Sequence, residues 1–121
     1  MEAGLVASGR FAWIETRGRR TGEPRAVTVG YVEDDIGPPG TIRVAAGAPE
    51  TAWARNLLAD PGCRVRIGES DTFDAVAEPL DAAEHARTIV GMILRYGTPA
   101  ENLGRGPTFR LRPVSGSAAA R

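Results

Sequence analysis

A basic turn between two apolar segments is the feature that most constrains the fold of this chain. The turn covers residues 17–25 (RGRRTGEPR) and separates the apolar residues 11–14 from residues 26–32. Its two glycines, its proline and its threonine hydroxyl are typical of a tight turn, so the flanking segments are predicted to form an antiparallel hairpin.

Four arginines share this connection: Arg17, Arg19, Arg20 and Arg25. Guanidinium groups on a turn rich in backbone N–H groups are suited to binding phosphate or carboxylate. The alternative is a solvated hairpin tip, because exposed charges are common in turns and contribute little.

Length and charge limit the classes of protein to consider. The 121 residues predict a single domain over residues 1–114, followed by a flexible C-terminal tail at residues 115–121. The net charge is zero, whereas a nucleic-acid-binding domain usually carries an excess of basic residues. No apolar run has the length of a signal peptide or a membrane span, so we expect a cytoplasmic protein without a membrane or nucleic-acid partner.

The residue types present exclude several kinds of catalysis. All 15 basic residues are arginine, so a mechanism that uses a lysine nucleophile is impossible. The only cysteine, Cys63, and the only histidine, His85, cannot form an internal disulfide or the usual His/Cys zinc site, and no metal is expected. We expect Cys63 to be a buried structural thiol and His85 to face solvent.

Alternating apolar and polar residues predict the secondary structure. Cys63, Val65 and Ile67 form one face of a strand, as do Phe109 and Leu111, and Tyr31 is expected to point into the core. The short links between strands favour a mainly β (α+β) fold, an antiparallel six-stranded barrel with two flanking helices. The expected strands are residues 10–16, 26–32, 41–46, 63–68, 72–80 and 108–114.

Two segments have helical patterns. In residues 49–60 a proline suits the first turn, and Trp53 and Leu57 lie on one face. In residues 81–96 Asp81 is the expected N-cap, with Glu84 three residues later. The apolar stripe of this second helix is expected to face the core; its residues are Ala86, Ile89, Val90, Ile93 and Leu94. Asp34 and Asp35 are expected in a solvated loop.

Three segments together resemble a known family. They are GRRTGEPR at residues 18–25, VAAG at residues 44–47 and WARNLLADP at residues 53–61. They are similar to the motifs of the deazaflavin-dependent nitroreductases, which have the split-barrel fold of flavin-binding reductases. The resemblance extends from residue 13 to about residue 80, and its third motif is the most specific.

The resemblance implies that the chain binds coenzyme F420, a deazaflavin hydride carrier with a phosphate and an oligoglutamate tail. The arginine turn would hold the anionic tail, the second strand would lie under the ring, and the loop after the third strand would approach the ring and the phosphate. The start of the first helix would border the site. The cofactor-binding positions implied in this way are Arg19, Arg20, Thr21, Arg25, Thr28, Gly47, Trp53 and Asn56. The hydride chemistry would belong to the cofactor, and no catalytic residue is identified.

The sequence departs from the family between residues 47 and 52, where relatives have a longer loop with a lysine. Two classes of function therefore remain open. The first is a deazaflavin-dependent reductase of a small nitro compound, quinone or enone, possible as a homodimer. The second is a cofactor-free cyclase or isomerase of natural-product biosynthesis that uses the vacated pocket, or a small-molecule-binding protein.

Overall fold

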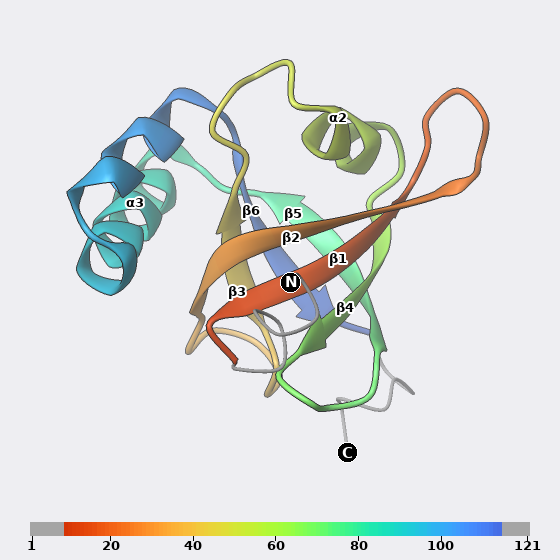
Figure 1. Ribbon diagram of the computed structural model, residues 1–121, viewed down its shortest axis with the longest axis horizontal. Helices are drawn as coiled ribbons and strands as arrows, with labels where there is room; N and C mark the ends of the chain where they lie inside the picture. The colour runs from red at the N-terminus through yellow and green to blue at the C-terminus, as the bar shows by residue number, and fades with distance from the viewer. Residues whose placement is uncertain (1–8, 115–121) are drawn as a thin grey trace.

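The computed structural model describes residues 9–114, in which six strands close into one antiparallel barrel (Figure 1). Around the barrel the order is β1-β2-β3-β6-β5-β4, and β4 pairs with β1 to complete the circle. The mainly β, antiparallel barrel expected from the alternating pattern is therefore confirmed. The strands are β1 (Phe11–Arg17), β2 (Pro24–Glu33), β3 (Ile42–Ala45), β4 (Gly62–Ile67), β5 (Phe73–Pro79) and β6 (Thr108–Pro113).

The barrel interior holds the main core. Side chains that alternate along each strand reach it, and Tyr31, Cys63 and Val65 are buried there as expected. Each large apolar side chain removed from water stabilises the fold by about 1.5–3 kcal/mol. Fully buried members of this core are Ala12, Ile14, Val44, Ala54, Val65, Phe109 and Leu111.

The helix α2 (Ala52–Ala59) lies across one end of the barrel, beside the turn that joins β1 to β2 (Figure 1). Its buried Trp53 and Leu57 face the core, as the spacing predicts. The expected start at residue 49 is too early. The Thr51 N–H donates to the Ala48 carbonyl (3.3 Å), which holds Pro49 and Glu50 in a turn before the helix.

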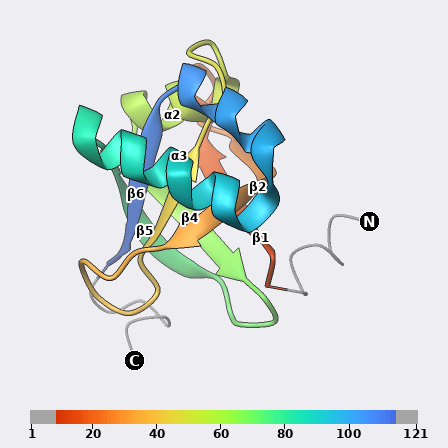
Figure 2. The ribbon, with the colours of Figure 1, turned by 90° about the vertical axis from the view of Figure 1, so that its left-hand side faces the viewer.

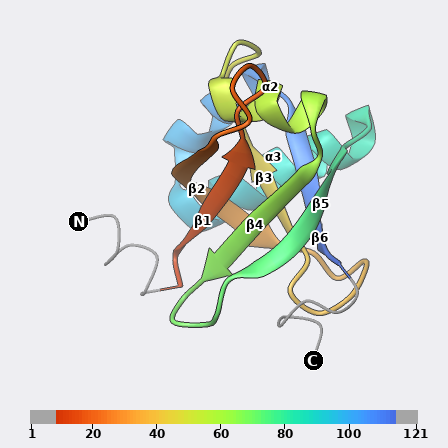
Figure 3. The same ribbon diagram turned by 90° about the vertical axis from the view of Figure 1, so that its right-hand side faces the viewer.

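The helix α3 (Ala82–Tyr96) and the 3₁₀ helix η1 (Thr98–Arg105) pack together over β2 and β3 (Figure 2). Asp81 caps α3 as expected, because its Oδ1 accepts from the Glu84 N–H at 2.8 Å. The η1 helix was not predicted. The outer face of β1, β4 and β5 carries no helix within residues 9–114 (Figure 3).

The predicted core stripe of α3 is confirmed only in part: Ile89 and Ile93 pack against a buried cluster around Met92, but Ala86, Val90 and Leu94 are exposed. Thr88 and Met92 are fully buried, whereas Val90 is 55% and Leu94 83% exposed. At Gly91 the helix lies close to β2, since a Cβ there would lie 3.2 Å from the Val32 side chain. The buried Thr88 hydroxyl is satisfied because it donates to the Glu84 carbonyl at 2.8 Å.

A buried ion-pair cluster joins β3, β6 and α3 to the segment after β2. Asp34 was expected in solvent, but its side chain is 0% exposed and accepts from Arg43 Nε (3.0 Å) and Arg110 Nε (2.6 Å). Arg110 also donates to Glu84. Burial alone would raise the pKa of Asp34, but the hydrogen bonds from Arg43, Arg110 and the Ile36 N–H outweigh it and lower that pKa to about 2.

Within residues 9–114 no helix is both long enough and apolar enough to cross a membrane.

Candidate functional site

The turn between β1 and β2 projects past the end of the barrel and is closed by its own hydrogen bonds (Figure 1). The Gly18 N–H donates to the Glu23 carbonyl and the Gly22 N–H to the Gly18 carbonyl, both at 2.8 Å. Gly22 has a φ of 76°, a conformation that favours glycine. Thr21 Oγ1 accepts from the Glu23 N–H at 3.2 Å. The arginines of the turn therefore stand on a rigid support.

A hollow of about 500 Å³ lies between this turn, the start of β2 and α2. No acidic residue lines it, and its apolar wall includes Val27. Most of the positions implied by the family resemblance meet here: Arg19, Arg20, Thr21, Arg25, Trp53 and Asn56 all line the hollow. Thr28 and Gly47 do not.

The three arginines of the hollow differ in what they contact. Arg20 makes no hydrogen bond or ion pair with any residue of the described chain. Arg25 lies 3.6 Å from Glu23, with both side chains more than 60% exposed, and such a pair is worth little. Arg19 is held by Asn56, whose Oδ1 accepts from the Arg19 N–H (3.2 Å) and from Nη1 (2.9 Å). The guanidinium groups of Arg20 and Arg25 thus remain available to an anion.

Trp53 and Asn56 belong both to the core and to the wall of the hollow. Trp53 is 9% exposed, and its ring centroid lies 6.2 Å from that of Phe109 in β6. Asn56 is 4% exposed, and its Nδ2 donates to Thr16 Oγ1 at 3.1 Å. In the motif WARNLLADP the tryptophan therefore anchors α2 in the barrel, and the asparagine connects α2 to the turn.

Thr28 and Gly47 lie elsewhere. Thr28 pairs with Trp13 in the β1–β2 ladder, between the core-facing Val27 and Val29. Gly47 has a φ of 86°, and a Cβ on it would meet the Leu103 side chain of η1 at 3.4 Å. Their contact with a bound ring stays a prediction.

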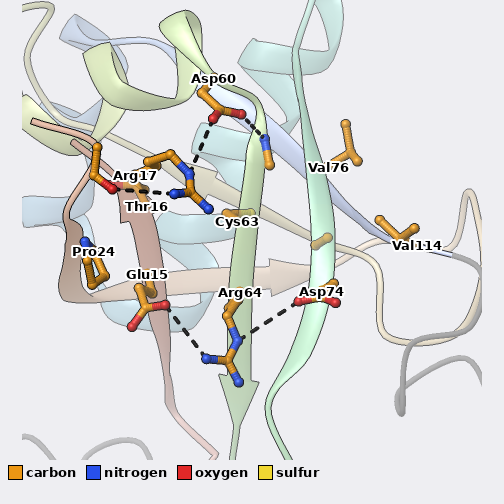
Figure 4. A pocket seen from close by; sticks show the side chains of 13 residues that line it. Glu15, Thr16, Arg17, Pro24, Asp60, Cys63, Arg64, Asp74, Val76 and Val114 are labelled. Atoms are coloured by element: carbon orange, nitrogen blue, oxygen red, sulfur yellow. Dashed lines mark hydrogen bonds and ion pairs between the residues drawn. The ribbon is translucent and has the colours of Figure 1, made fainter. Parts of the chain in front are cut away.

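A second hollow, of about 510 Å³, lies over β1, β4 and β5 on the other side of the turn (Figure 4). Its charged side chains pair with one another: Arg17 lies 3.6 Å from Asp60, and Arg64 lies 3.8 Å from Glu15 and 3.9 Å from Asp74. Three carboxylates against two guanidinium groups make this hollow unsuited to an anion.

Cys63 lines this second hollow as the buried thiol that the sequence predicts. Burial, followed by the nearby carboxylates of Asp74 and Asp60, raises its pKa to about 12. The folded state therefore favours the neutral thiol. The resulting stabilisation is present below the ordinary thiol pKa of 9.0 and is lost as pH rises toward 12.

We expect Cys63 to react with a thiol-specific reagent at pH 8 at least about a hundredfold more slowly in the folded protein than in urea, because only the thiolate reacts. The chain has no other cysteine, so the whole absorbance signal reports this residue. Equal rates in buffer and urea would contradict the burial and the raised pKa.

His85 was expected to face solvent, but it is half-buried and both of its ring nitrogens have partners. Its Nδ1 lies 2.9 Å from Thr108 Oγ1, and its Nε2 lies 3.1 Å from the Gly104 carbonyl oxygen. The second of these contacts comes from η1, the unpredicted helix that carries Gly104. Both ring nitrogens are engaged, and residues 9–114 contain no cluster of three His, Cys, Asp or Glu side chains that could hold a metal ion.

Comparisons with known proteins agree with this architecture. The profile of one family, described as F420H(2)-dependent quinone reductase, matches residues 4–101. No protein with a curated description matches the sequence.

Solved structures share the fold at low identity. HutZ, described as the heme storage protein from Vibrio cholerae, has a TM-score of 0.70 at 22% identity over 97% of this chain and 90% of that chain. An F420-H2 dependent reductase, FDR-A, has a TM-score of 0.69 at 23% identity over 85% and 94%. A structure described as a domain-swapped dimer has a TM-score of 0.68 at 21% identity over 91% and 92%. These likenesses establish the split-barrel fold.

Proposed function

The chain belongs to the F420H(2)-dependent quinone reductase family, and from this premise we propose that it is a deazaflavin-dependent oxidoreductase acting on a small organic molecule such as a quinone. The observation that carries the proposal is Arg20, a guanidinium without a partner in the described chain, beside Arg25 in a hollow that no carboxylate lines.

The residues of the hollow fit the anionic part of coenzyme F420, its phosphate and oligoglutamate tail. Guanidinium groups form short, charge-assisted hydrogen bonds to phosphate and carboxylate, and these are about twice as strong as neutral ones. Trp53 and Val27 supply apolar surface next to the arginines. The arginines thus fit the charge of the cofactor tail, and the apolar residues fit the part of the cofactor that would lie nearer the barrel.

The roles of the residues follow from this fit. The bound cofactor would supply the hydride. Arg20 and Arg25 would hold the tail, Thr21 would keep the turn closed, and Trp53 would exclude water from the barrel side. The hollow is lined by no histidine or carboxylate that could act as a general base or activate the Thr21 hydroxyl, in keeping with a reaction whose chemistry resides in the cofactor.

We expect Arg20→Ala to weaken binding of F420 at least about tenfold, equivalent to about 1.4 kcal/mol. The hollow is open to solvent and no lysine assists, so binding should also weaken as salt screens the arginines. Fluorescence titration of F420 at low and high salt measures both effects.

Arg55→Ala is the matched control for this titration, because Arg55 is exposed on α2 and does not line the hollow. It should change the dissociation constant for F420 less than about twofold, since an exposed charge outside the hollow is largely screened by salt and water. A parent protein that fails to bind F420 at any salt concentration would overturn the proposed function. If the Arg20→Ala protein binds F420 as tightly as the parent does, Arg20 is not part of the binding site.

Other functions have less support. Heme storage is described for one structural neighbour, but the single histidine of this chain has both nitrogens engaged by Thr108 and Gly104. The cofactor-free cyclase or isomerase has no counterpart among the comparisons, and an arginine-lined hollow suits an anion better than an apolar substrate. A homodimer remains part of the proposal, supported by the neighbour described as a domain-swapped dimer.

A further inference from the structure

The amide of Asn56 connects three parts of the chain that meet at the hollow. Its Oδ1 accepts twice from Arg19, and its Nδ2 donates to Thr16 Oγ1 near the end of β1. The Thr16 hydroxyl in turn points to the Arg25 carbonyl at 3.5 Å. One side chain of α2 thus reaches both strands of the hairpin and the turn between them.

The Asn56–Thr16 part of this connection is buried, whereas another contact between the end of α2 and the hairpin is exposed. Asn56 is 4% and Thr16 is 1% exposed. The ion pair of Asp60 with Arg17 is 3.6 Å long and half exposed, so it holds the hairpin only weakly. A buried amide with its hydrogen bonds satisfied is costly to disrupt, because its removal leaves donors without partners.

The same contacts separate the roles of the neighbouring arginines. Arg19 donates with its backbone N–H and with Nη1 to one oxygen atom, so one nitrogen of its guanidinium group is engaged by α2. Arg20 follows it on the turn and has no partner in the described chain. The position of Arg20 in the hollow therefore depends on how firmly Arg19 is held.

We propose that Asn56 is a positioning residue: through Arg19 and Thr16 it fixes the arginine turn against α2, so that Arg20 and Arg25 hold the anion and Arg19 serves as a strut rather than as a ligand. This inference rests on the proposed function for the identity of the anion. The tether itself is a property of the fold and can be measured without any ligand.

Amide hydrogen exchange tests the tether. The Arg19 N–H is protected by Asn56 Oδ1, and in Asn56→Ala its exchange should be at least tenfold faster at a temperature where circular dichroism shows the parental fold. In Asn56→Asp the carboxylate still accepts from Arg19, and the Thr16 hydroxyl can donate to it, so protection should persist. Exchange at the parental rate in Asn56→Ala overturns the proposal.

The hydroxyl of Thr16 offers an independent pair of variants. Thr16→Val keeps the shape of the side chain but leaves Asn56 Nδ2 without its acceptor, and we expect Arg19 exchange to quicken several-fold. Thr16→Ser keeps the hydroxyl and should stay within twofold of the parent. If Asn56→Ala fails to fold, the two Thr16 variants still test the tether. Equal exchange of the Arg19 N–H in Thr16→Val and Thr16→Ser overturns the proposal.

Fluorescence titration with F420 tests the consequence for binding. Asn56→Ala should raise the dissociation constant about tenfold without changing its dependence on salt, because every arginine keeps its charge. Arg20→Ala should instead reduce the salt dependence, since one charge–charge contact is lost. A reduced salt dependence in Asn56→Ala, or binding as tight as that of the parent, overturns the positioning role.

The two proposals fail in different ways. A parent protein that does not bind F420 overturns the proposed function and, with it, the assignment of Arg20 and Arg25 to this anion. Slow Arg19 exchange in the parent and fast exchange in Asn56→Ala would then still establish the tether, whereas exchange at equal rates overturns the tether even if F420 binds.

Discussion

Replacing Asp34 with alanine is expected to lower the free energy of unfolding by about 3–5 kcal/mol, the cost of removing one partner from a buried ion-pair network. The Asp34 side chain is 0% exposed, and Arg43 and Arg110 beside it are 11% and 12% exposed. Without Asp34, both guanidinium groups stay buried with only Glu84 to balance them. Urea denaturation followed by circular dichroism measures the loss.

The adjacent Asp35 is the matched control for this substitution. It is exposed and carries the same side chain on the same loop, so Asp35→Ala should change stability by less than about 0.5 kcal/mol. Asp34→Asn keeps the shape of the side chain but loses its charge. Its loss of stability should lie between those of Asp34→Ala and Asp35→Ala. Equal stability of the Asp34→Ala and Asp35→Ala proteins would show that the cluster contributes nothing.

The low pKa of Asp34 gives the same prediction a dependence on pH. Because its pKa is about 2 in the folded state against an ordinary value of 3.8, the charged form stabilises the fold. This contribution, about 2 kcal/mol, is present above pH 4 and is lost as pH falls toward 2. The parent should therefore lose stability more steeply over this range than Asp34→Asn does.

The sequence predicted the barrel because each strand carries its own alternating pattern. Val65 and Leu111 would be buried whichever strands lay beside them, so the local alternation was sufficient to predict their burial. Asp34 could not be placed in this way: it lies in a polar segment, EDDIGPPG, and its partners Arg43 and Arg110 come from two later strands. Only the register of the β3–β6 ladder, which pairs Arg43 with Arg110, brings them together.

The helices show where pattern is insufficient. Apolar residues lie on more than one face of α3, and the sequence pattern assigned Val90 to the core, whereas the structure buries Met92 and leaves Val90 exposed. The short η1 helix has too few turns to show a period, and the partners of His85 were missed with it. For the candidate site, the family motifs pointed to residues that meet in the hollow, but the division of roles between Arg19 and Arg20 depends on Asn56, a contact that spacing does not show.

Gly106→Ala is expected to destabilise the protein by about 3 kcal/mol or more, at the upper end of the range for overpacked sites. A Cβ at Gly106 would lie 2.4 Å from the Ala48 nitrogen and 2.9 Å from the Ala48 Cα. Backbone atoms, unlike the end of a side chain, cannot relieve such a clash by rotating to another conformation. Gly106 has a φ of −112°, which alanine adopts freely. The cost would therefore come entirely from the close approach of the two segments.

The substitution bears on the site because Ala48 lies in the short loop before α2. That loop is held by the Ala46 N–H, which donates to the Pro107 carbonyl at 3.0 Å, and by the Thr51 hydroxyl, which donates to the Ala46 carbonyl at 3.2 Å. Moving Ala48 away from Gly106 would shift the start of α2, and with it Trp53 in the wall of the hollow. Thermal unfolding should change, and so should the tryptophan fluorescence, to which Trp13 and Trp53 both contribute.

Gly104→Ala is the control, since a Cβ there would meet the side chains of Ile89 at 3.6 Å and His85 at 3.9 Å, both ordinary contacts. It should stay within about 1 kcal/mol of the parent, because alanine is a better helix former than glycine and no backbone is displaced. If Gly106→Ala and Gly104→Ala were equally stable, the loop before α2 would be able to move away from residue 106 at little cost. The close packing of residues 47–51 against the chain before β6 would then not be what fixes the start of α2 beside the arginine turn.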